Sequence, residues 1–334
     1  MAFLTKRSLS IVLGFAISLI AIYFIARGID FGKVANALSL ANYWWLIPNI
    51  VVILFSMYQR AWRWGRMTAP IKRVRFEHLL SSTAIGFMAN NILPLRLGEF
   101  VRAYALSRQD PEISKSASLA MIFTERIVFD LAALLAIFGV VLGVTSIEIE
   151  ESVKNNSLVI LAVALAGCIF ALVIAKWPGP IAAFAGRRLA FLPGLAAEFV
   201  VSVIQKFALG LQFMRRLSDG LSVMLQTAFI WIFLGLSNYF VFLVFDLALP
   251  LEASFATLAI VSIAILLPSS PGFIGVYHAA VIFTLGQYDV DKETAVACAI
   301  VMHAAQYVAV TLFGLYHLWR SQLTISDVGS GPNE

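Results

Sequence analysis

The sequence reads Asn91-Ile92-Leu93-Pro94-Leu95-Arg96-Leu97-Gly98-Glu99 where one apolar segment is interrupted, and Leu266-Leu267-Pro268-Ser269-Ser270-Pro271-Gly272 where a second is interrupted. Both stretches contain Leu-Pro, three residues and then Gly. Proline removes a backbone donor and glycine relaxes the backbone, so we expect a helix to stop at each place. Within a membrane, such a break needs protein or a water-filled cavity around its free backbone groups. Paired breaks of this kind indicate a transport site.

The composition is that of a polytopic membrane protein. The chain has 334 residues, of which 60% are hydrophobic and 13% are charged, and its mean hydropathy is +0.88. A soluble domain carries about 25% charged residues. The net charge of +5 comes from loops, so we expect no nucleic-acid partner. Cys168 and Cys298 lie in apolar spans without the spacing of a disulfide framework or a metal site.

Six segments are long enough, or nearly so, to cross the membrane, which takes about 20 residues. They are 9–26, 43–59, 118–144, 157–175, 222–247 and 294–319. The first follows Lys6 and Arg7 like a signal peptide, but its length and the lack of a clear cleavage site favour a retained span.

The loops predict the orientation. Segments 60–77 and 176–221 are rich in Lys and Arg, whereas 145–156 and 286–293 each hold one lysine. By the positive-inside rule the first two are cytoplasmic and the last two face outward, so both termini are cytoplasmic. We expect a bacterial or archaeal plasma (inner) membrane.

Four shorter apolar limbs flank the breaks: 78–92 and 97–108, then 254–267 and 272–286. Each spans only about 18–22 Å as a helix, which is short of a full crossing. We therefore predict two re-entrant hairpins, 78–108 and 254–286, that enter from opposite faces as an inverted repeat. Two unrelated proline breaks, or four limbs that all cross as thin spans, are the alternatives.

The predicted fold class is an all-α polytopic membrane protein with about six full transmembrane helices and these two hairpins. It forms a single transmembrane domain with halves 1–156 and 219–320. A cytoplasmic amphipathic linker, about 180–218, joins the halves and suits a helix on the inner leaflet. The polar tail 321–334 is predicted to be disordered.

Charged residues in a membrane segment are functional candidates by default. The first hairpin offers Asn91, Arg96, Glu99 and Arg102, and Glu99 can pair with Arg102 three residues on. Arg96 lies in the break beside an opening helix, which favours phosphate binding.

The third full span adds Glu125, Arg126 and Asp130. Arg126 can pair with Asp130, and Glu125 needs a partner such as Arg96 or Arg102. These groups predict one buried cluster without net charge that consists of Arg96, Glu99, Arg102, Glu125, Arg126 and Asp130. The cluster is either a headgroup site or a structural staple.

The second hairpin is uncharged. Gly272 and Gly275 allow close approach of backbone amides to a ligand. The remaining candidates in the second half are Ser269, Ser270, His278, His303 and Gln306. The two histidines suit a proton relay, headgroup hydrogen bonding or packing better than a metal. Ser237 and Asn238 are typical of contacts between membrane helices.

Three motifs together resemble the lysylphosphatidylglycerol synthase transmembrane (flippase-like) family. They are the stretch 90–104, the trio Glu125-Arg126…Asp130, and the stretch 268–276. Phe273 and His278 stand where the family often has a second glycine and an acidic residue. The resemblance implies translocation of a lipid between leaflets. We expect no synthase activity, because no soluble domain is visible in the sequence.

The sequence therefore predicts a flippase for a phosphate-containing lipid: a phospholipid, an aminoacyl-phospholipid, a glycolipid or a polyprenyl-phosphate-linked lipid. We expect no enzymatic activity, cofactor or metal. The expected partners are lipid headgroups, and a lipid-modifying enzyme as partner or an oligomer is compatible with the sequence. The alternatives are a membrane enzyme with Glu99 or Glu125 as base, an ion-coupled transporter of a small solute, and an accessory subunit.

Overall fold

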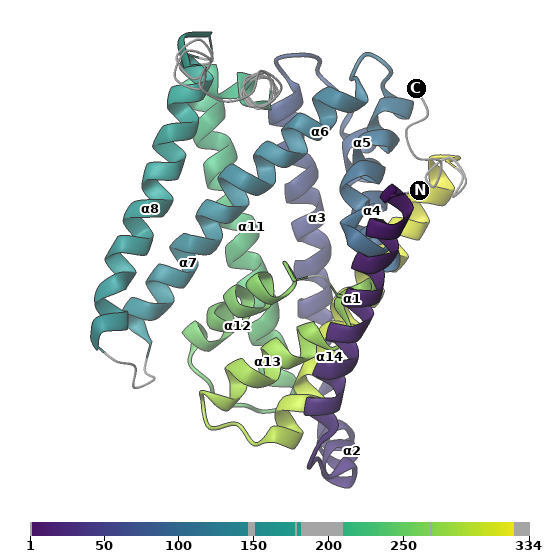
Figure 1. The fold of residues 1–334 in the computed structure, drawn as a ribbon, viewed down its shortest axis with the longest axis vertical. Coiled ribbons are helices and arrows are strands. Elements are labelled where there is room, and N and C mark those ends of the chain that lie inside the picture. The colour runs from purple at the N-terminus through teal and green to yellow at the C-terminus, as the bar shows by residue number, and fades with distance from the viewer. Residues whose placement is uncertain (1, 146–150, 178, 182–209, 268, 324–334) are drawn as a thin grey trace.

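The computed structural model describes residues 2–145, 151–177, 179–181, 210–267 and 269–323, and this part of the chain contains helices and no strand (Figure 1). The helices are α1 Ala2–Ala26, α2 Phe31–Leu40, α3 Leu46–Thr68, α4 Phe76–Ile92, α5 Gly98–Gln109, α6 Lys115–Thr124, α7 Leu131–Val144, α8 Glu151–Lys176, α11 Leu217–Val244, α12 Leu251–Ala264, α13 Val276–Gly286 and α14 Lys292–Arg320. Short 3₁₀ turns occupy Tyr43–Trp45, Pro94–Arg96, Gln212–Arg215 and Pro271–Phe273, and a π-helical segment, Glu125–Asp130, joins α6 to α7.

Three continuous helical stretches are long and apolar enough to cross a membrane: 115–144, 218–244 and 292–320. The pair Val12–Ala26 and Phe31–Leu40, bent by 88°, would be a fourth span. Large apolar side chains are exposed along α8 and α14, including Leu158, Phe170 and Trp319. Such a surface suits lipid rather than water. The chain is therefore a helical membrane protein with several membrane-spanning helices.

The two interrupted segments form two helical hairpins. Helices α4 and α5 pack against each other at one end of the molecule, and α12 and α13 do so nearer the opposite end (Figure 1). The turn Pro94–Arg96 contacts the turn Pro271–Phe273, so the tips of the two hairpins meet. Helix α14 runs past both hairpins and packs against α4 and α13.

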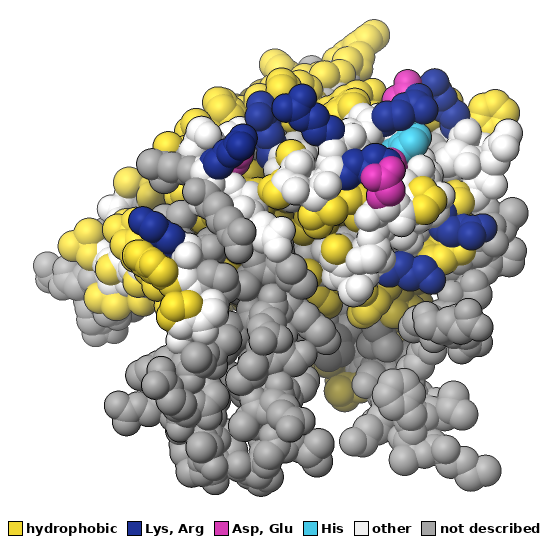
Figure 2. All heavy atoms as spheres, turned by 90° about the horizontal axis from the view of Figure 1, so that it is seen from above, with side chains coloured by type: hydrophobic (Ala, Val, Ile, Leu, Met, Phe, Trp, Pro, Cys, Tyr) yellow, Lys and Arg dark blue, Asp and Glu magenta, His cyan; other side chains and the backbone are white. Residues whose placement is uncertain are grey.

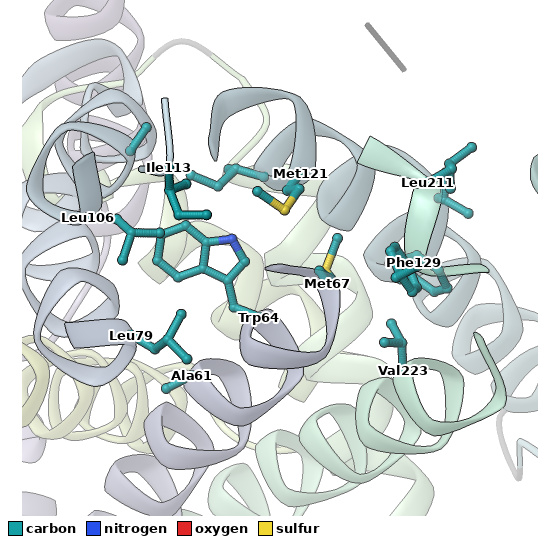
Figure 3. Packing of buried hydrophobic residues seen from close by; sticks show 14 of the residues in the cluster. Ala61, Trp64, Met67, Leu79, Leu106, Ile113, Met121, Phe129, Leu211 and Val223 are labelled. Carbon is teal, nitrogen blue, oxygen red and sulfur yellow. The ribbon is translucent and has the colours of Figure 1, made fainter. Parts of the chain in front are cut away.

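The largest buried apolar cluster surrounds Trp64 of α3 (Figure 3). It joins α3 to α4, α5, α6 and α11, because Met67, Leu79, Leu106, Met121 and Val223 all belong to it. A second cluster holds α12 and α13 against α11 and α14. The first hairpin is thus fixed on one side by the Trp64 cluster.

Two predictions fall wholly or largely outside the described residues. The amphipathic linker 180–218 is described only in part, at its two ends, and the tail is described only as far as residue 323. Both therefore stay predictions.

Candidate functional site

The two breaks share a local structure, but the Leu-Pro-x-x-x-Gly pattern aligned them at the wrong residues. Pro94 and Pro271 each begin a 3₁₀ turn, and the third residue of each turn has a positive φ, 54° at Arg96 and 60° at Phe273. Gly98 and Gly275 follow two residues later. Pro94 therefore corresponds to Pro271, whereas the Leu-Pro-x-x-x-Gly pattern had paired it with Pro268. Residues other than glycine rarely adopt a positive φ, and backbone strain of this kind clusters at functional sites.

A cavity of about 200 Å³ lies where the two tips meet, and we call it the tip cavity. Residues of both hairpins line it: Asn90, Leu93, Pro94 and Arg96 of the first, and Ile265, Leu266, Leu267, Ser269, Ser270, Gly272 and Phe273 of the second. Arg96 is the one cation among its lining residues, and the guanidinium carbon lies 5.5 Å from the centroid of the Phe273 ring. The cavity thus offers one positive charge beside hydroxyl and backbone groups.

Two asparagines fix the first break. Asn90 Oδ1 accepts a hydrogen bond of 2.8 Å from the Gly98 amide, which satisfies a free donor at the start of α5. Asn91 Nδ2 donates to Thr311 Oγ1 at 3.0 Å and to the Tyr307 carbonyl at 3.3 Å. Asn91 therefore anchors the break to α14 and does not line the cavity.

The second break is held by α1. The Ser270 amide donates to Ser18 Oγ at 2.9 Å, and a Cβ on Gly275 would come within 2.7 Å of the Ser18 carbonyl oxygen. Ser269, Ser270 and Gly272 line the tip cavity, and their predicted role in substrate binding stays a prediction. Gly275 instead allows α1 to approach closely.

The two predicted histidines meet beside this break. The ring centroids of His278 and His303 are 4.8 Å apart, and Tyr277 stacks on His303 at 4.6 Å. His278 Nδ1 accepts from the Gly275 amide at 3.4 Å. Gln306 is exposed and does not join them. Among the described residues, no group of three or more His, Cys, Asp or Glu side chains could hold a metal ion.

The charged residues form one network, with partners that differ in part from those predicted. Arg126 pairs with Asp130 at 2.9 Å as expected, and Glu125 pairs with Arg102 at 3.1 Å. Glu99 pairs with Arg126 at 2.9 Å and not with Arg102. The predicted Glu99–Arg102 pair is wrong because Arg102 points toward α3, where its guanidinium carbon lies 4.1 Å from the centroid of the Trp64 ring. Arg96 makes no ion pair with a described residue.

Sequence reasoning missed Arg60 and Arg63. It ended the second span at residue 59 and assigned both arginines to a cytoplasmic loop, whereas α3 continues to Thr68. Arg63 is fully buried and binds Glu125 at 2.7 Å and Asp130 at 2.8 Å. The signal was the helical spacing of Met57, Ala61 and Trp64, which carries the apolar face past the charges.

The π-helical segment explains why one arginine reaches two carboxylates. Glu125 and Asp130 are five residues apart, and i→i+5 hydrogen bonding brings such residues toward one face. Thr227 of α11 completes the site, since Arg63 Nη1 also donates to its hydroxyl at 2.8 Å. Segments of this type are common at functional sites.

We call the set Arg60, Arg63, Glu99, Arg102, Glu125, Arg126 and Asp130 the charged cluster. Its four arginines and three carboxylates give +1 when all are ionised, and Arg96 in the tip cavity adds a further positive charge. The predicted cluster had no net charge because it lacked Arg60 and Arg63. The excess is positive, as an anion-binding region requires.

The two interrupted helices and the buried charged cluster place the chain among helical membrane proteins that carry ion pairs between their helices. The chain matches the family model for the lysylphosphatidylglycerol synthase TM region over residues 11–314, so it belongs to that family. This match confirms the resemblance inferred from the motifs.

Two archaeal proteins are similar to the chain. Glycosyltransferase AglD of Haloferax volcanii is 27% identical, with 92% of this chain and 54% of that protein covered. The chain thus spans about half the length of that relative. UPF0104 membrane protein MJ1078 of Methanocaldococcus jannaschii is 26% identical, with 67% of this chain and 90% of that protein covered.

Proposed function

We propose that the protein moves a phosphate-containing lipid between the two leaflets of a membrane. One observation carries the proposal: helical hairpins from opposite ends of the molecule meet at a cavity whose lining contains a single cation, Arg96. A lipid headgroup needs a polar path, while its acyl chains can stay in the bilayer. Membership of a family named for a phospholipid synthase supports a lipid substrate.

The proposed topology has six crossings and two re-entrant hairpins, with both termini in the cytoplasm. Figure 2 shows Lys and Arg side chains spread over the end of the molecule where α3 ends and α4 begins. The exposed residues there include Arg75, Arg108 and Lys115. Under the positive-inside rule this end is cytoplasmic. The first hairpin then enters from the cytoplasm and the second from outside.

In this function, Arg96 binds the phosphate at the tip cavity, and the Ser269 and Ser270 region lines the opposite wall. Charge-assisted hydrogen bonds from arginine suit phosphate oxygens. The charged cluster adjoins the tip cavity, because Asn90, which lines the cavity, donates from Nδ2 to Glu99 Oε1 at 3.5 Å. Arginines of the charged cluster can exchange a carboxylate partner for the phosphate of the headgroup as the lipid passes.

Reconstituted vesicles test the proposal. With a fluorescent anionic phospholipid in both leaflets, wild-type protein should make the inner-leaflet probe accessible to an impermeant quencher. Arg96→Ala should slow this exchange at least about tenfold, as expected for the loss of a charged hydrogen bond. Arg66→Ala is the control, because Arg66 is exposed on α3. Equal exchange by wild type and Arg96→Ala would contradict the function.

A membrane enzyme acting on a lipid-linked substrate is the second candidate, because one relative is named a glycosyltransferase. Glu99 would be its base, since this carboxylate is partly accessible, whereas Glu125 is fully buried. Mass spectrometry of lipids incubated with the protein separates the candidates. A lipid of altered mass favours the enzyme, and unchanged lipid that crosses the bilayer favours the flippase. A separate lipid-modifying enzyme is then a proposed partner.

A further inference from the structure

Arg60 is the exception within the charged cluster. It lies on α3 with 6% of its surface exposed, and its Nε and Nη1 atoms have no hydrogen-bond partner among the described residues. Every other arginine of the cluster has a carboxylate oxygen within 3.1 Å. Arg60 instead lies against the Phe87 ring, whose centroid is 4.9 Å from the guanidinium carbon of Arg60.

Arg60 makes no ion pair with a described residue, although Asp130 acts on it from beyond ion-pair distance. A buried arginine without an ion-pair partner is costly, and it cannot escape the cost by losing its proton. Contact with an aromatic ring returns only part of the lost hydration. A purely structural role is served better by an apolar side chain of similar length, such as methionine. The unpaired guanidinium is therefore suited to bind an anion.

The surroundings favour an anion between Arg60 and Arg126. Both guanidinium groups lie against Phe87, with carbon-to-centroid distances of 4.9 and 5.2 Å. The Arg126 side chain is 30% exposed, whereas those of Arg63 and Arg102 are almost fully buried. A ligand can therefore approach from the side of Arg126. The cluster carries one positive charge in excess, which one monoanion would balance.

We propose that Arg60 and Arg126, beside Phe87, form a second phosphate-binding position, separate from Arg96 in the tip cavity. Its ligand is the phosphate of a lipid headgroup, and this assignment rests on the proposed function. Arg126 pairs with Glu99, which accepts a hydrogen bond from Asn90 of the tip cavity, and it shares the Phe87 ring with Arg60. A headgroup that leaves Arg96 is thus passed to Arg60 by way of Arg126. Each guanidinium provides the planar fork of donors that matches phosphate oxygens.

Thermal unfolding of purified protein in detergent tests the position. The variants are Arg60→Met, which removes the charge, and Arg66→Met, which is the exposed control on the same helix. Each is measured without added lipid, with phosphatidylglycerol, with diacylglycerol of the same acyl chains, and with inorganic phosphate. Without lipid, Arg60→Met should unfold at the same temperature as wild type or higher. It should lose most of the upward shift that phosphatidylglycerol gives wild type and Arg66→Met.

The ligand arms identify the source of the phosphate. A shift with phosphatidylglycerol but not with inorganic phosphate or diacylglycerol supports a headgroup site. An equal shift with inorganic phosphate, also lost in Arg60→Met, overturns the assignment to a lipid. A lower unfolding temperature for lipid-free Arg60→Met, with the phosphatidylglycerol shift retained, overturns the site.

Arg60→Lys is a second test, which holds even if Arg60→Met does not fold. It keeps the charge but loses the planar fork, so phosphatidylglycerol should bind about tenfold more weakly, the loss expected for a charged hydrogen bond. Unchanged binding by Arg60→Lys and by Arg60→Met would contradict the site. Impaired exchange in Arg96→Ala vesicles alongside that result would leave the proposed function standing without this second position.

Discussion

Arg63 connects three helical elements through its side chain alone. It binds Glu125 and Asp130 of the π-helical segment and donates to Thr227 of α11. Removing it leaves two carboxylates partly unpaired in the protein interior. We expect Arg63→Met to lower the free energy of unfolding by about 3–5 kcal/mol, the usual effect of breaking a buried pair. Denaturant unfolding in detergent would measure it.

Arg66→Met is the matched control for Arg63, since it removes an exposed arginine from the next turn of α3. Its effect should be within about 0.5 kcal/mol of zero. The double variant Arg63→Met/Glu125→Gln should lose less than the sum of the two single variants, because their charges depend on each other. Additive losses would show that Arg63 and Glu125 do not pair.

Asp110, at the end of α5, gives a pH-dependent prediction outside the membrane-spanning segments. Burial raises the pKa of Asp110, but hydrogen bonds with His78 and Lys72 outweigh it and hold that pKa below its ordinary value of 3.8. A lowered carboxyl pKa contributes stability that is complete above the unfolded pKa and is lost as the pH falls through the folded one. Asp110→Asn should therefore destabilise the protein at pH 7.

We expect a loss of about 1 kcal/mol, a small value because the Lys72 side chain is partly exposed. The difference between wild type and Asp110→Asn should shrink as the pH falls below about 3.8. Glu112→Gln is the control, because Glu112 binds the same lysine at 2.6 Å with its side chain 73% exposed. Unfolding temperatures across pH 3–7 provide the measurement, and a pH-independent difference would exclude Asp110 as its source.

The contact between α4 and α5 depends on two glycines, Gly86 and Gly98. A Cβ on Gly98 would overlap the Gly86 carbonyl oxygen and lie 2.5 Å from Asn90 Oδ1. Gly98→Ala should therefore force the hairpin apart at its tip and destabilise the protein by about 1–3 kcal/mol, the cost of overpacking. Lipid exchange should fall as well, since the tip cavity is lined by Asn90 and Arg96.

Gly167→Ala in α8 is the matched control, because no atom lies within 4 Å of a Cβ placed there. It should leave both unfolding and lipid exchange unchanged. A Gly98→Ala protein with the stability and exchange of wild type would show that the tip of the hairpin is not tightly packed. Thermal unfolding and the vesicle assay would measure the two effects side by side.

Several elements follow closely from the sequence, because proline and glycine act locally. The limb predicted at 78–92 is α4 Phe76–Ile92, and that predicted at 97–108 is α5 Gly98–Gln109. Helix α2 was missed, since its ten residues are too short for a span. The π-helical segment was also missed, because an i→i+5 turn has no distinct residue pattern. The partners of Glu125 depend on α3, which lies far away in the sequence.

At the scale of the molecule, the sequence predicted that the two breaks belong to one site but did not show how they meet. The correspondence of Pro94 with Pro271 becomes visible only through the backbone, where Arg96 and Phe273 share a positive φ. The Leu-Pro-x-x-x-Gly pattern was misleading because two prolines stand close together in the second break. Tertiary contacts with α1 and α14 fix each tip, and no local pattern reveals such contacts.

The proposed re-entrant topology makes a prediction about access to the tips. If both hairpins turn back inside the membrane, cysteines at Leu93 and Ser270 lie at the tip cavity and not at either surface. An impermeant thiol reagent should then label them far more slowly than a cysteine at exposed Arg75 or Glu112.

If all four limbs cross instead, Leu93→Cys lies at the outer face and Ser270→Cys at the cytoplasmic face, and each labels quickly from that side. Replacing Cys168 and Cys298 first removes the background thiols. The rate of labelling from each side of sealed vesicles decides between the two topologies, because the loops have the same orientation in both.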